Sequence, residues 1–452
     1  MRKICIVTFG CQMNKLDSEL AAEALQDAGH LVVADESAAD TVIFNTCAVR
    51  DHAEQRALSR LAQLRTRREA DDGFRLGLMG CFAEREGEAL LERLPYLDFA
   101  VGTRQFMRLP DVLAQAERGR CGRFGEADAP SPGIDGAHPR SRHSGIHGYV
   151  SIMRGCANRC AYCAVPGVRG GETCRPAAEA VREVRALAAA GAREVTLLGQ
   201  NIDAYGKGGE WNLARLLRHI EETVPPDAGI ARIRFVTSHP RDITRELAAT
   251  VAALPRVCGH FHMPAQSGSD RVLRAMRRGY SRAEYEEKLA MIRDVAPTAT
   301  VASDFIVGFP GETDGDFLAT LDLVEKARFQ NSYIFKYSPR PGTLAARDLE
   351  DDVPGPEKRR RNLALLEAQN AVNRERAAEL VGSRQTILVE GVSARDYSRW
   401  TGRTAENLIC VFPAPGNGGI KAGDLLDLDI YSATPLTLFG RPGRGAASAR
   451  CG

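Results

Sequence analysis

The chain has 452 residues, 44% hydrophobic and 26% charged, which is an ordinary composition for a globular protein of about three domains. Its formal net charge of +2 excludes a strong basic field over the whole molecule. No apolar run approaches the ~18 residues of a membrane helix, and the apolar stretch at 4–9 is too short for a signal peptide. We therefore expect a cytoplasmic protein with no membrane partner. Its twelve cysteines then indicate metal or redox chemistry before disulfides.

The first part of the chain, residues 1–118, alternates predicted strands with predicted helices. Apolar segments at 3–9, 31–34, 41–45 and 75–79 predict strands, and helical periodicity appears at 17–28, 55–67 and 84–94. This α/β alternation predicts a parallel sheet of flavodoxin-like order with helices on both faces. Residues 119–147 are rich in Gly, Pro, Ser and charge, so we expect a linker there.

The central part, residues 148–380, repeats a strand–helix unit six times. Strands are predicted at 149–153, 194–198, 232–236, 259–263, 300–307 and 332–337, and helices at 177–190, 213–224, 244–254, 282–294 and 314–327. Six repeats favour a partial (β/α)6 barrel, with an open doubly wound sheet as the alternative. A charged helix at 355–380 ends this part and connects it to the next.

The last part, residues 381–440, is predicted to be a small all-β domain. Its strands are expected at 385–390, 408–411, 425–431 and 436–439. Residues 441–452 should form a disordered tail.

Three cysteines with Cys-x3-Cys-x2-Cys spacing follow the first barrel strand. Cys156, Cys160 and Cys163 lie in a loop at the rim where barrel active sites are found. Three thiolates can bind three irons of a four-iron cluster and leave the fourth iron open to a substrate. The alternative is structural zinc, which needs four ligands. Only Cys174 is near enough in sequence to be the fourth, and no second Cys-x2-Cys pair exists.

A second set of cysteines follows the predicted strands of the first domain. Cys11, Cys47 and Cys81 each come just after such a strand. Because the carboxyl ends of parallel strands lie at one edge of a sheet, these thiols can converge on one point. Buried structural thiols are the alternative. Cys5, Cys258 and Cys410 are expected to pack inside strands, and Cys121 to lie in a flexible segment.

With the motifs around them, these cysteines resemble those of the radical S-adenosylmethionine methylthiotransferases. Tyr162 before the last cysteine of the loop is typical of radical S-adenosylmethionine enzymes. The agreement runs from residue 2 to about 440 and includes TFGCQMN (8–14), NTC (45–47), GC (80–81), GQN (199–201), TSHP (237–240), QSGSD (266–270), FIVGFPGET (305–313) and SPRPGT (338–343). The resemblance implies an amino-terminal methylthiotransferase domain, a radical S-adenosylmethionine barrel and a carboxy-terminal TRAM domain, which is a small RNA-binding β barrel.

The resemblance also implies cofactors and site residues. The cofactors are two 4Fe-4S clusters, one on each set of three cysteines, and S-adenosylmethionine. The open iron of the loop cluster binds S-adenosylmethionine, and one electron cleaves it to methionine and a 5′-deoxyadenosyl radical. Tyr162 would lie near the adenine. The turn of Gly199, Gln200 and Asn201 would contact the methionine amino group, and Gly308, Gly311 and Glu312 would lie against the nucleoside.

Within the family, the resemblance is to the type that converts N(6)-dimethylallyladenosine, beside the tRNA anticodon, into its 2-methylthio form. It implies three partners: a tRNA carrying that nucleoside, a reducing electron donor of flavodoxin or ferredoxin type, and a sulfur donor. Related enzymes act on tRNA threonylcarbamoyladenosine or on a ribosomal-protein aspartate. The first usually has Lys-Val-Asn and the second Pro-Lys-Asn where this chain has QMN at 12–14, so both are disfavoured. Intact loop cysteines disfavour a non-catalytic tRNA-binding iron–sulfur protein.

Two further features bear on RNA binding. Tyr397 and Trp400 are predicted to share one loop of the last domain, where an aromatic ring could stack on a base. The basic run KRRR at 358–361 reads first as a solvated helix face and second as a phosphate contact. His260 and His262 alternate on one predicted strand and are assigned to packing, without a metal.

Overall fold

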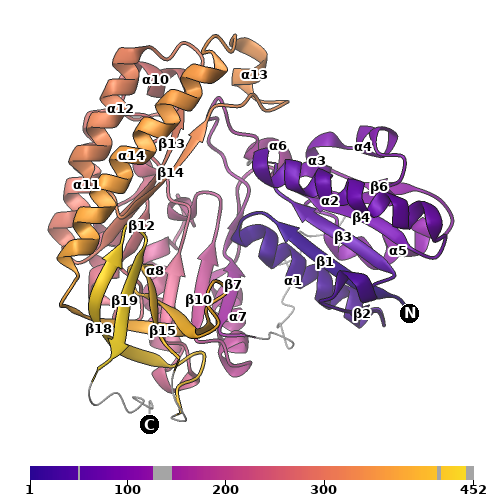
Figure 1. Ribbon diagram of the computed structural model, residues 1–452, viewed down its shortest axis with the longest axis horizontal. Coiled ribbons are helices and arrows are strands. Elements are labelled where there is room, and N and C mark those ends of the chain that lie inside the picture. Colours follow the sequence, from indigo (N-terminus) through magenta and orange to yellow (C-terminus); the bar gives the residue numbers. More distant parts are fainter. Residues whose placement is uncertain (49–50, 126–144, 415–418, 444–452) are drawn as a thin grey trace.

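An all-parallel sheet forms the amino-terminal domain of the computed structural model, which describes residues 1–48, 51–125, 145–414 and 419–443 (Figure 1). Its strand order is β2-β1-β3-β4-β5-β6. The strands are β1 (Lys3–Phe9), β2 (Leu31–Val32), β3 (Thr41–Thr46), β4 (Arg75–Gly80), β5 (Phe99–Val101) and β6 (Cys121–Arg123). The predicted flavodoxin-like sheet is therefore confirmed.

Helices cover both faces of this sheet because its central strands are apolar on both sides. Helices α1 (Gln12–Asp27) and α5 (Leu109–Ala116) pack with Ile4 and Ile43 on one face. Helices α2 (Asp51–Ala70), α3 (Cys81–Glu86) and α4 (Ala89–Arg93) pack with Val42 and Phe44 on the other. The single helix expected at 84–94 is thus two helices, because Gly87, with φ +60°, ends α3.

This domain extends further along the chain than the sequence predicts. β6 begins at Cys121 and pairs with β5, so the predicted linker at 119–147 opens with a strand, and Cys121 is not in a flexible segment. At three residues each, β5 and β6 are too short to show periodicity. Residues 126–144, most of the predicted linker, lie outside the described part of the chain.

Six parallel strands form the central domain. β7 (His147–Ser151), β10 (Glu194–Leu198) and β11 (Arg232–Phe235) form one sheet, and β12 (His260–His262), β13 (Thr300–Val307) and β14 (Asn331–Lys336) form the other. A bridge between Ile233 and Val257 joins the two sheets. The spatial order follows the chain order, so the structure is the predicted partial barrel and not the doubly wound alternative.

One continuous core fills the central domain between its strands and the outer helices. Those helices are α7 (Ala177–Ala189), α8 (Leu213–Thr223), α9 (Arg245–Ala253), α11 (Arg282–Val295) and α12 (Asp314–Ala327). Shorter elements of the central domain are β8 (Met153–Arg154), β9 (Thr173–Cys174), α6 (Val165–Arg169), α10 (Asp270–Ala275) and α13 (Leu344–Asp348). Its 3₁₀ turns are η3 (Ile202–Ala204), η4 (Pro226–Ala228) and η5 (Pro240–Asp242). The turns η1 (Glu36–Ala38) and η2 (Phe106–Arg108) belong to the amino-terminal domain. Among the described helices, none is both long and apolar enough to cross a lipid bilayer.

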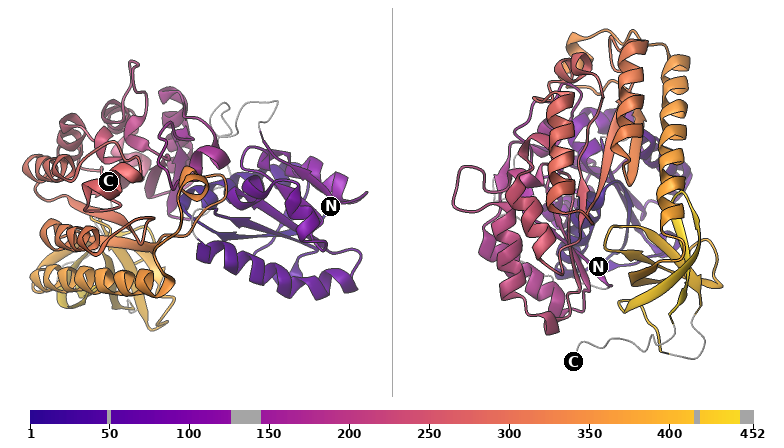
Figure 2. Two further views of the ribbon diagram at one scale, coloured as in Figure 1. Left: turned by 90° about the horizontal axis from the view of Figure 1, so that it is seen from above. Right: turned by 90° about the vertical axis from the view of Figure 1, so that its left-hand side faces the viewer.

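Helix α14 (Gly355–Glu379) runs beside α12 and leads into a closed β barrel (Figure 2). The barrel order is β15-β16-β17-β19-β18. Its strands are β15 (Arg384–Val392), β16 (Arg399–Thr404), β17 (Ile409–Pro413), β18 (Leu425–Thr434) and β19 (Thr437–Pro442). The predicted small all-β barrel is confirmed. β19 runs past residue 440, where we had expected the domain to end, and residues 444–452 lie outside the described part.

Strand β16 was not predicted, because its residues RWTGRT are mostly polar. Trp400 lies on this strand, paired with Phe412, and packs against the barrel core. The prediction that Trp400 lies in a loop with Tyr397 is therefore wrong. Tyr397 lies outside the strand and is 83% exposed.

Buried arginines of the central domain hold the β barrel in place. The Arg234 guanidinium donates to the carbonyls of Ala405 at 2.7 Å and Thr404 at 2.8 Å, and pairs with Glu194 at 2.8 Å. Arg232 donates to the carbonyl of Thr386 at 3.0 Å. These arginines begin and continue β11, so the β barrel docks at the amino ends of the central strands, away from their carboxyl rim.

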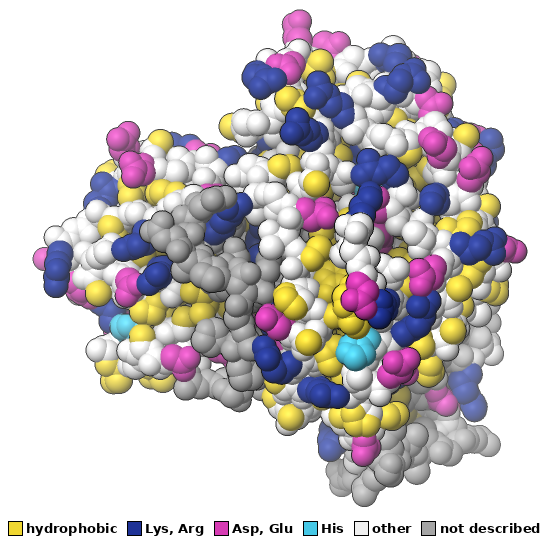
Figure 3. Space-filling view, turned by 180° about the vertical axis from the view of Figure 1, so that it is seen from behind, with side chains coloured by type: hydrophobic (Ala, Val, Ile, Leu, Met, Phe, Trp, Pro, Cys, Tyr) yellow, Lys and Arg dark blue, Asp and Glu magenta, His cyan; other side chains and the backbone are white. Residues whose placement is uncertain are grey.

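Charges of both signs are interspersed on the face shown in Figure 3, where Lys and Arg side chains lie among Asp and Glu. This agrees with the net charge of +2. Contact with a polyanion then depends on local groups.

Candidate active site and metal centres

Cys156, Cys160 and Cys163 lie on a closed loop between β8 and α6. The ends of the loop meet where the backbone N–H of Cys156 donates to the carbonyl of Gly170 at 3.2 Å. Gly155 has φ +72°, and a Cβ there would overlap the carbonyl oxygen of Gly171. Only glycine fits this crossing. The loop therefore projects as one lobe from the carboxyl rim of the barrel.

The environment of the three loop thiols suits a metal cluster. Arg278 donates from Nη1 to Cys160 Sγ at 3.2 Å, and the N–H of Asn158 to Cys156 Sγ at 3.4 Å. Burial, followed by the nearby Cys160, raises the pKa of the Cys163 thiol to about 12. The thiol is thus protonated at neutral pH and ionises only when a metal displaces its proton.

The spacing of side chains argues against a single metal ion. Across the described residues, no three His, Cys, Asp or Glu side chains lie close enough to hold one ion. A zinc site requires such closeness, because all its ligands bind the same atom. In a four-iron cluster each thiolate binds a different iron, so the ligands stand further apart. The described geometry thus gives no support to a zinc site, and the cluster on the three loop thiols stays a prediction.

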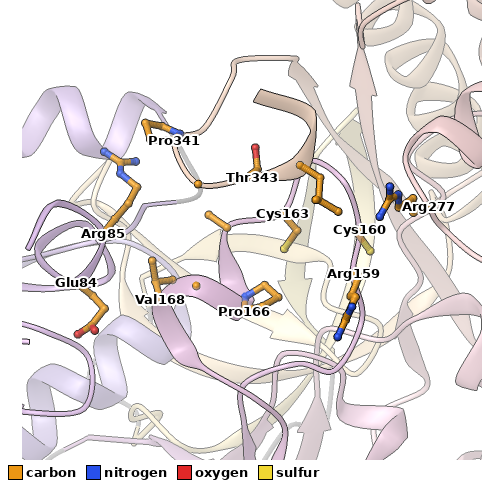
Figure 4. Close-up of a pocket in the computed structure, with 14 residues that line it drawn as sticks. Glu84, Arg85, Arg159, Cys160, Cys163, Pro166, Val168, Arg277, Pro341 and Thr343 are labelled. Carbon is orange, nitrogen blue, oxygen red and sulfur yellow. The ribbon is translucent and has the colours of Figure 1, made fainter. Parts of the chain in front are cut away.

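A cavity of about 460 Å³ opens onto these thiols (Figure 4). Four parts of the chain line it: helix α3, the cysteine loop with α6, the segment after α10, and the loop that leads into α13. The lining residues are Glu84, Arg85, Arg159, Cys160, Cys163, Ala164, Pro166, Gly167, Val168, Arg277, Pro341, Gly342, Thr343 and Leu344. Because α3 begins at Cys81, the cavity reaches from the loop thiols toward the second set of cysteines.

The turn at 199–201 lies directly beside the cysteine loop. Gln200 accepts a hydrogen bond at Oε1 from the backbone N–H of Gly155, and a Cβ on Gly199 would overlap Met153. Asn201 donates to Asp242 at 2.8 Å, which leaves its own Oδ1 buried and without a partner.

Other buried polar atoms near this turn also lack partners among the described residues. They are His239 Nε2 and Gln266 Oε1, and they follow the carboxyl ends of β11 and β12. Thr237 and Gln266 have φ of 75° and 70°, which is strained for residues with a side chain. Unpaired buried polar atoms are costly, so this group fits a polar ligand such as the methionine moiety and ribose of S-adenosylmethionine.

The turn at 308–312 is filled by protein. The N–H of Gly308 donates to Glu312 Oε1 at 2.8 Å, and Glu312 pairs with Arg361 at 2.8 Å. A Cβ on Gly308, where φ is +69°, would overlap the side chain of Lys358. The glycine thus makes room for helix α14. Phe309 of this turn packs with the cysteine loop beside Tyr162.

Strand register brings the second set of cysteines to one edge. Phe9, Thr46 and Gly80 are in register across β1, β3 and β4, and Cys11, Cys47 and Cys81 come one or two residues later. Cys81 and Cys11 interact electrostatically, and the N–H of Cys47 donates to the carbonyl of Phe9 at 3.0 Å. Cys47 and Cys81 are each 4% exposed. This thiol set also fits a cluster.

Two asparagines organise this edge, and the sequence reasoning missed them. Asn14 Oδ1 accepts from the N–H of Cys11 at 3.3 Å, and Asn14 Nδ2 donates to Asn45 Oδ1 at 3.0 Å. A Cβ on Gly10 would overlap Asn14, and one on Gly80 would overlap Asn45. The pair therefore fills the space left by both glycines. Their place beside the cysteines in TFGCQMN and NTC was the available signal.

The remaining candidates have structural partners. Lys358 and Arg361 are buried and pair with Asp351 and Glu312, whereas Arg359 and Arg360 are exposed, so the expected solvated face is correct for only half of the run at 358–361. His260 contacts Thr300 at 2.8 Å, and His262 contacts Asp304 at 3.0 Å. Cys174 accepts from the N–H of Gly206 at 3.3 Å. Cys5, Cys258 and Cys410 are buried, as expected.

Comparisons with known proteins agree with this arrangement. Residues 150–324 match the Radical SAM superfamily, and residues 3–102 match the uncharacterized protein family UPF0004. The tRNA-2-methylthio-N(6)-dimethylallyladenosine synthase of Geobacter sulfurreducens is 45% identical over 90% of this chain and 91% of its own length. The chain belongs to the tRNA-2-methylthio-N(6)-dimethylallyladenosine synthase family. The synthase of Chlorobium phaeobacteroides is 41% identical over 98% of this chain and 97% of its own length.

A solved structure supports the fold of this synthase family member. The radical S-adenosylmethionine methyltransferase TsrM from Kitasatospora setae, with cobalamin and a [4Fe-4S] cluster bound, has a TM-score of 0.56 and 16% identity. The match covers 76% of this chain and 77% of that one. At this identity the likeness concerns the fold alone.

Proposed function

We propose that the chain methylthiolates carbon 2 of N(6)-dimethylallyladenosine next to the anticodon of tRNA. The observation that supports the proposal is the cavity beside Cys160 and Cys163, which is also lined by helix α3, the helix that begins at Cys81. Membership of the synthase family supplies the substrate. The reaction takes place in the cytoplasm, where thiols remain reduced.

Cys156, Cys160 and Cys163 would hold the cluster that binds S-adenosylmethionine, and Cys11, Cys47 and Cys81 the auxiliary cluster. When bound, these groups supply a carbon radical, a methyl group and sulfur. The protein supplies the positioning. Asn201, His239 and Gln266 would offer the unpartnered polar atoms to S-adenosylmethionine. Tyr162 is held by Arg278 at 3.2 Å beside the site of the adenine.

The roles of Gly199 and Gln200, and of Gly308, Gly311 and Glu312, are proposed as support for the bound ligand. Gln200 fixes the start of the cysteine loop, and Glu312 with the two glycines shapes the turn that packs on it. Each acts by fixing the backbone around the ligand, since an error of about 1 Å in position can cost a hundredfold in rate.

The tRNA backbone is proposed to meet Arg159 and Arg277 at the mouth of the cavity. Both are exposed cavity residues, and neither forms an ion pair within the described ranges. Free guanidinium groups at a cavity mouth are suited to phosphates. An electron donor of flavodoxin or ferredoxin type and a sulfur donor complete the set of partners.

Nucleoside mass analysis of tRNA from a deletion strain tests this function. The strain should accumulate dimethylallyladenosine without its 2-methylthio form, and the wild-type gene should restore the product. The Cys156→Ala gene should not. Normal 2-methylthio-dimethylallyladenosine in the deletion strain, or a change confined to threonylcarbamoyladenosine or to a ribosomal aspartate, would contradict the proposal.

A further inference from the structure

A buried ion triad joins the amino-terminal domain to the cysteine loop. Asp17, on α1, accepts from Arg154 Nη2 at 3.0 Å and from Arg169 Nη2 at 2.7 Å. The three side chains are 1%, 6% and 4% exposed. Arg154 precedes the loop and Arg169 follows it, so both ends of the loop are fastened to one carboxylate of the other domain.

The triad carries a surplus of positive charge. Two guanidinium groups face one carboxylate, and burial of such a charge is costly unless another anion lies near. Arg154 Nε and Arg169 Nη1 are buried without a hydrogen-bond partner of normal geometry among the described residues. The triad therefore has one net positive charge that its own carboxylate does not compensate, and N–H groups that find no acceptor within the triad.

The surplus charge lies beside the auxiliary cysteines. The charge of Arg169 acts on the Cys81 thiol and also reaches Cys11. The preceding residue, Val168, packs directly against Cys81 and Ala48. A cluster bound by thiolates is anionic, so it supplies the counter-charge that the triad lacks.

We infer that Arg169, held by Asp17 and Arg154, stabilises the anionic sulfur of the auxiliary centre and sets its reduction potential; the inference rests on the proposed function of Cys11, Cys47 and Cys81. Hydrogen bonds to cluster sulfurs and local charge both control this potential. Arg169 is a positioning residue, because it acts through the cluster ligand. It ends the lobe that carries the other three thiols, so the same contact also fixes the two centres relative to each other.

The charge argument predicts shifts of opposite sign. Removing the positive charge in Arg169→Gln makes reduction harder and lowers the midpoint potential. Removing the negative charge in Asp17→Asn leaves the arginines uncompensated and raises it. A merely structural role would not reverse the sign, because both changes break the same ion pair.

The experiment uses the full chain with Cys156, Cys160 and Cys163 replaced by alanine, so that only the auxiliary centre is read. Bound iron is counted, and the midpoint potential is measured by dithionite titration followed by electron paramagnetic resonance. Arg169→Gln, Arg169→Lys and Asp17→Asn are compared in this background. Arg175→Gln is the matched control, since Arg175 is also buried but pairs with Glu183 inside the barrel.

Support requires a lower potential in Arg169→Gln, a smaller shift in Arg169→Lys, a higher potential in Asp17→Asn and no shift in Arg175→Gln. Unchanged potentials, shifts of one sign, or loss of iron from all three triad variants would overturn the inference. If Arg169→Gln is the only variant that loses iron, the midpoint potentials of Arg169→Lys and Asp17→Asn decide whether the inference stands. Absence of iron from the parent protein itself would instead refute the proposed auxiliary centre.

Discussion

Cys11 differs from the other auxiliary thiols in being partly exposed, whereas Cys47 and Cys81 are buried. We predict that Cys11→Ala abolishes methylthiolation but spares reductive cleavage of S-adenosylmethionine, because the cleavage needs only the thiols of the barrel loop. Product nucleoside and 5′-deoxyadenosine are measured in the same reaction. The matched control is Cys5→Ala, a buried thiol of β1, which should retain both reactions. Normal product from Cys11→Ala would refute this division of labour.

Asp203 is a second residue whose environment predicts behaviour. Burial raises its pKa to about 7, against hydrogen bonds from Ser238 and from the backbone of His239, which lower it. A raised folded-state pKa favours the protonated form, so its contribution to stability is full at low pH and is lost as pH rises through 7. Between pH 5.5 and 8.5 this loss amounts to about 2 kcal/mol.

We therefore predict that Asp203→Asn gains stability relative to wild type as pH rises over that interval. The amide cannot ionise, so it avoids the buried charge. Thermal unfolding of the metal-free protein at both pH values measures the difference, and Asp227→Asn, at an exposed aspartate of η4, should follow wild type. A constant difference between Asp203→Asn and wild type at the two pH values would show that Asp203 keeps its ionisation state.

At the scale of elements, the cysteine loop depends on the crossing of its ends at Gly155. Alanine there meets both the positive φ of 72° and the Gly171 carbonyl. We predict that Gly155→Ala loses about half of the bound iron, the share of one of two four-iron clusters, and most of the S-adenosylmethionine cleavage. Gly167→Ala is the control, because its Cβ would enter open space. Full iron content in Gly155→Ala would show that the loop tolerates the strain.

The β barrel offers Tyr397 to solvent, and we predict that Tyr397→Ala weakens tRNA binding with little change in its salt dependence. Stacking on a base contributes about 1–3 kcal/mol and does not release counterions as phosphate contacts do. Affinity across a salt series tests this, with Tyr397→Phe as the control that keeps the ring. Wild-type affinity in Tyr397→Ala would remove the residue from the RNA contact. Trp400→Ala should instead lower stability, since Trp400 packs on the barrel core.

Elements with strong apolar periodicity could be predicted from sequence, and those set by tertiary contacts could not. β10 and β13 have the predicted bounds of 194–198 and 300–307, because continuous apolar runs define buried parallel strands. β16 is polar and is held by pairing with β15 and β17. The split between α3 and α4 depends on the positive φ of Gly87, which the helical period does not reveal.

The sites show the same limit. Cysteine spacing predicted the loop set, and position after the strands predicted the second set, since loop length and strand ends follow from local sequence. The Asn14–Asn45 pair and the contact of Asp17 with two arginines join residues 31 to 152 positions apart. The apolar periodicity of the sequence does not reveal contacts between residues so far apart in the chain. The burial of Arg361 in the basic run at 358–361 was missed for the same reason, because its partner Glu312 comes from another segment.

At the scale of the whole molecule, Arg234 joins the β barrel to the central domain. We predict that Arg234→Gln increases cleavage near residues 380–384 in limited proteolysis, because it breaks two hydrogen bonds to backbone carbonyls and leaves Glu194 with less compensation. Breaking one partner of a buried pair costs about 3–5 kcal/mol. The control is Arg245→Gln, which breaks an exposed pair with Asp294 outside the segment 380–384; exposed pairs contribute little to stability. Equal cleavage of the two variants would show that other contacts hold the domain.

The position of the β barrel has a consequence for which tRNAs can be modified. It docks at the amino ends of the central strands, whereas the cavity lies at their carboxyl rim. A tRNA gripped by the β barrel must reach along the outside of the central domain to place a base in the cavity. The length of β10 and its neighbouring strands, about 17 Å for five residues, plus the loops at each end, would then set the distance between the bound tRNA segment and the base in the cavity. An adenosine at another distance from the bound segment would not reach the cavity and would not be modified.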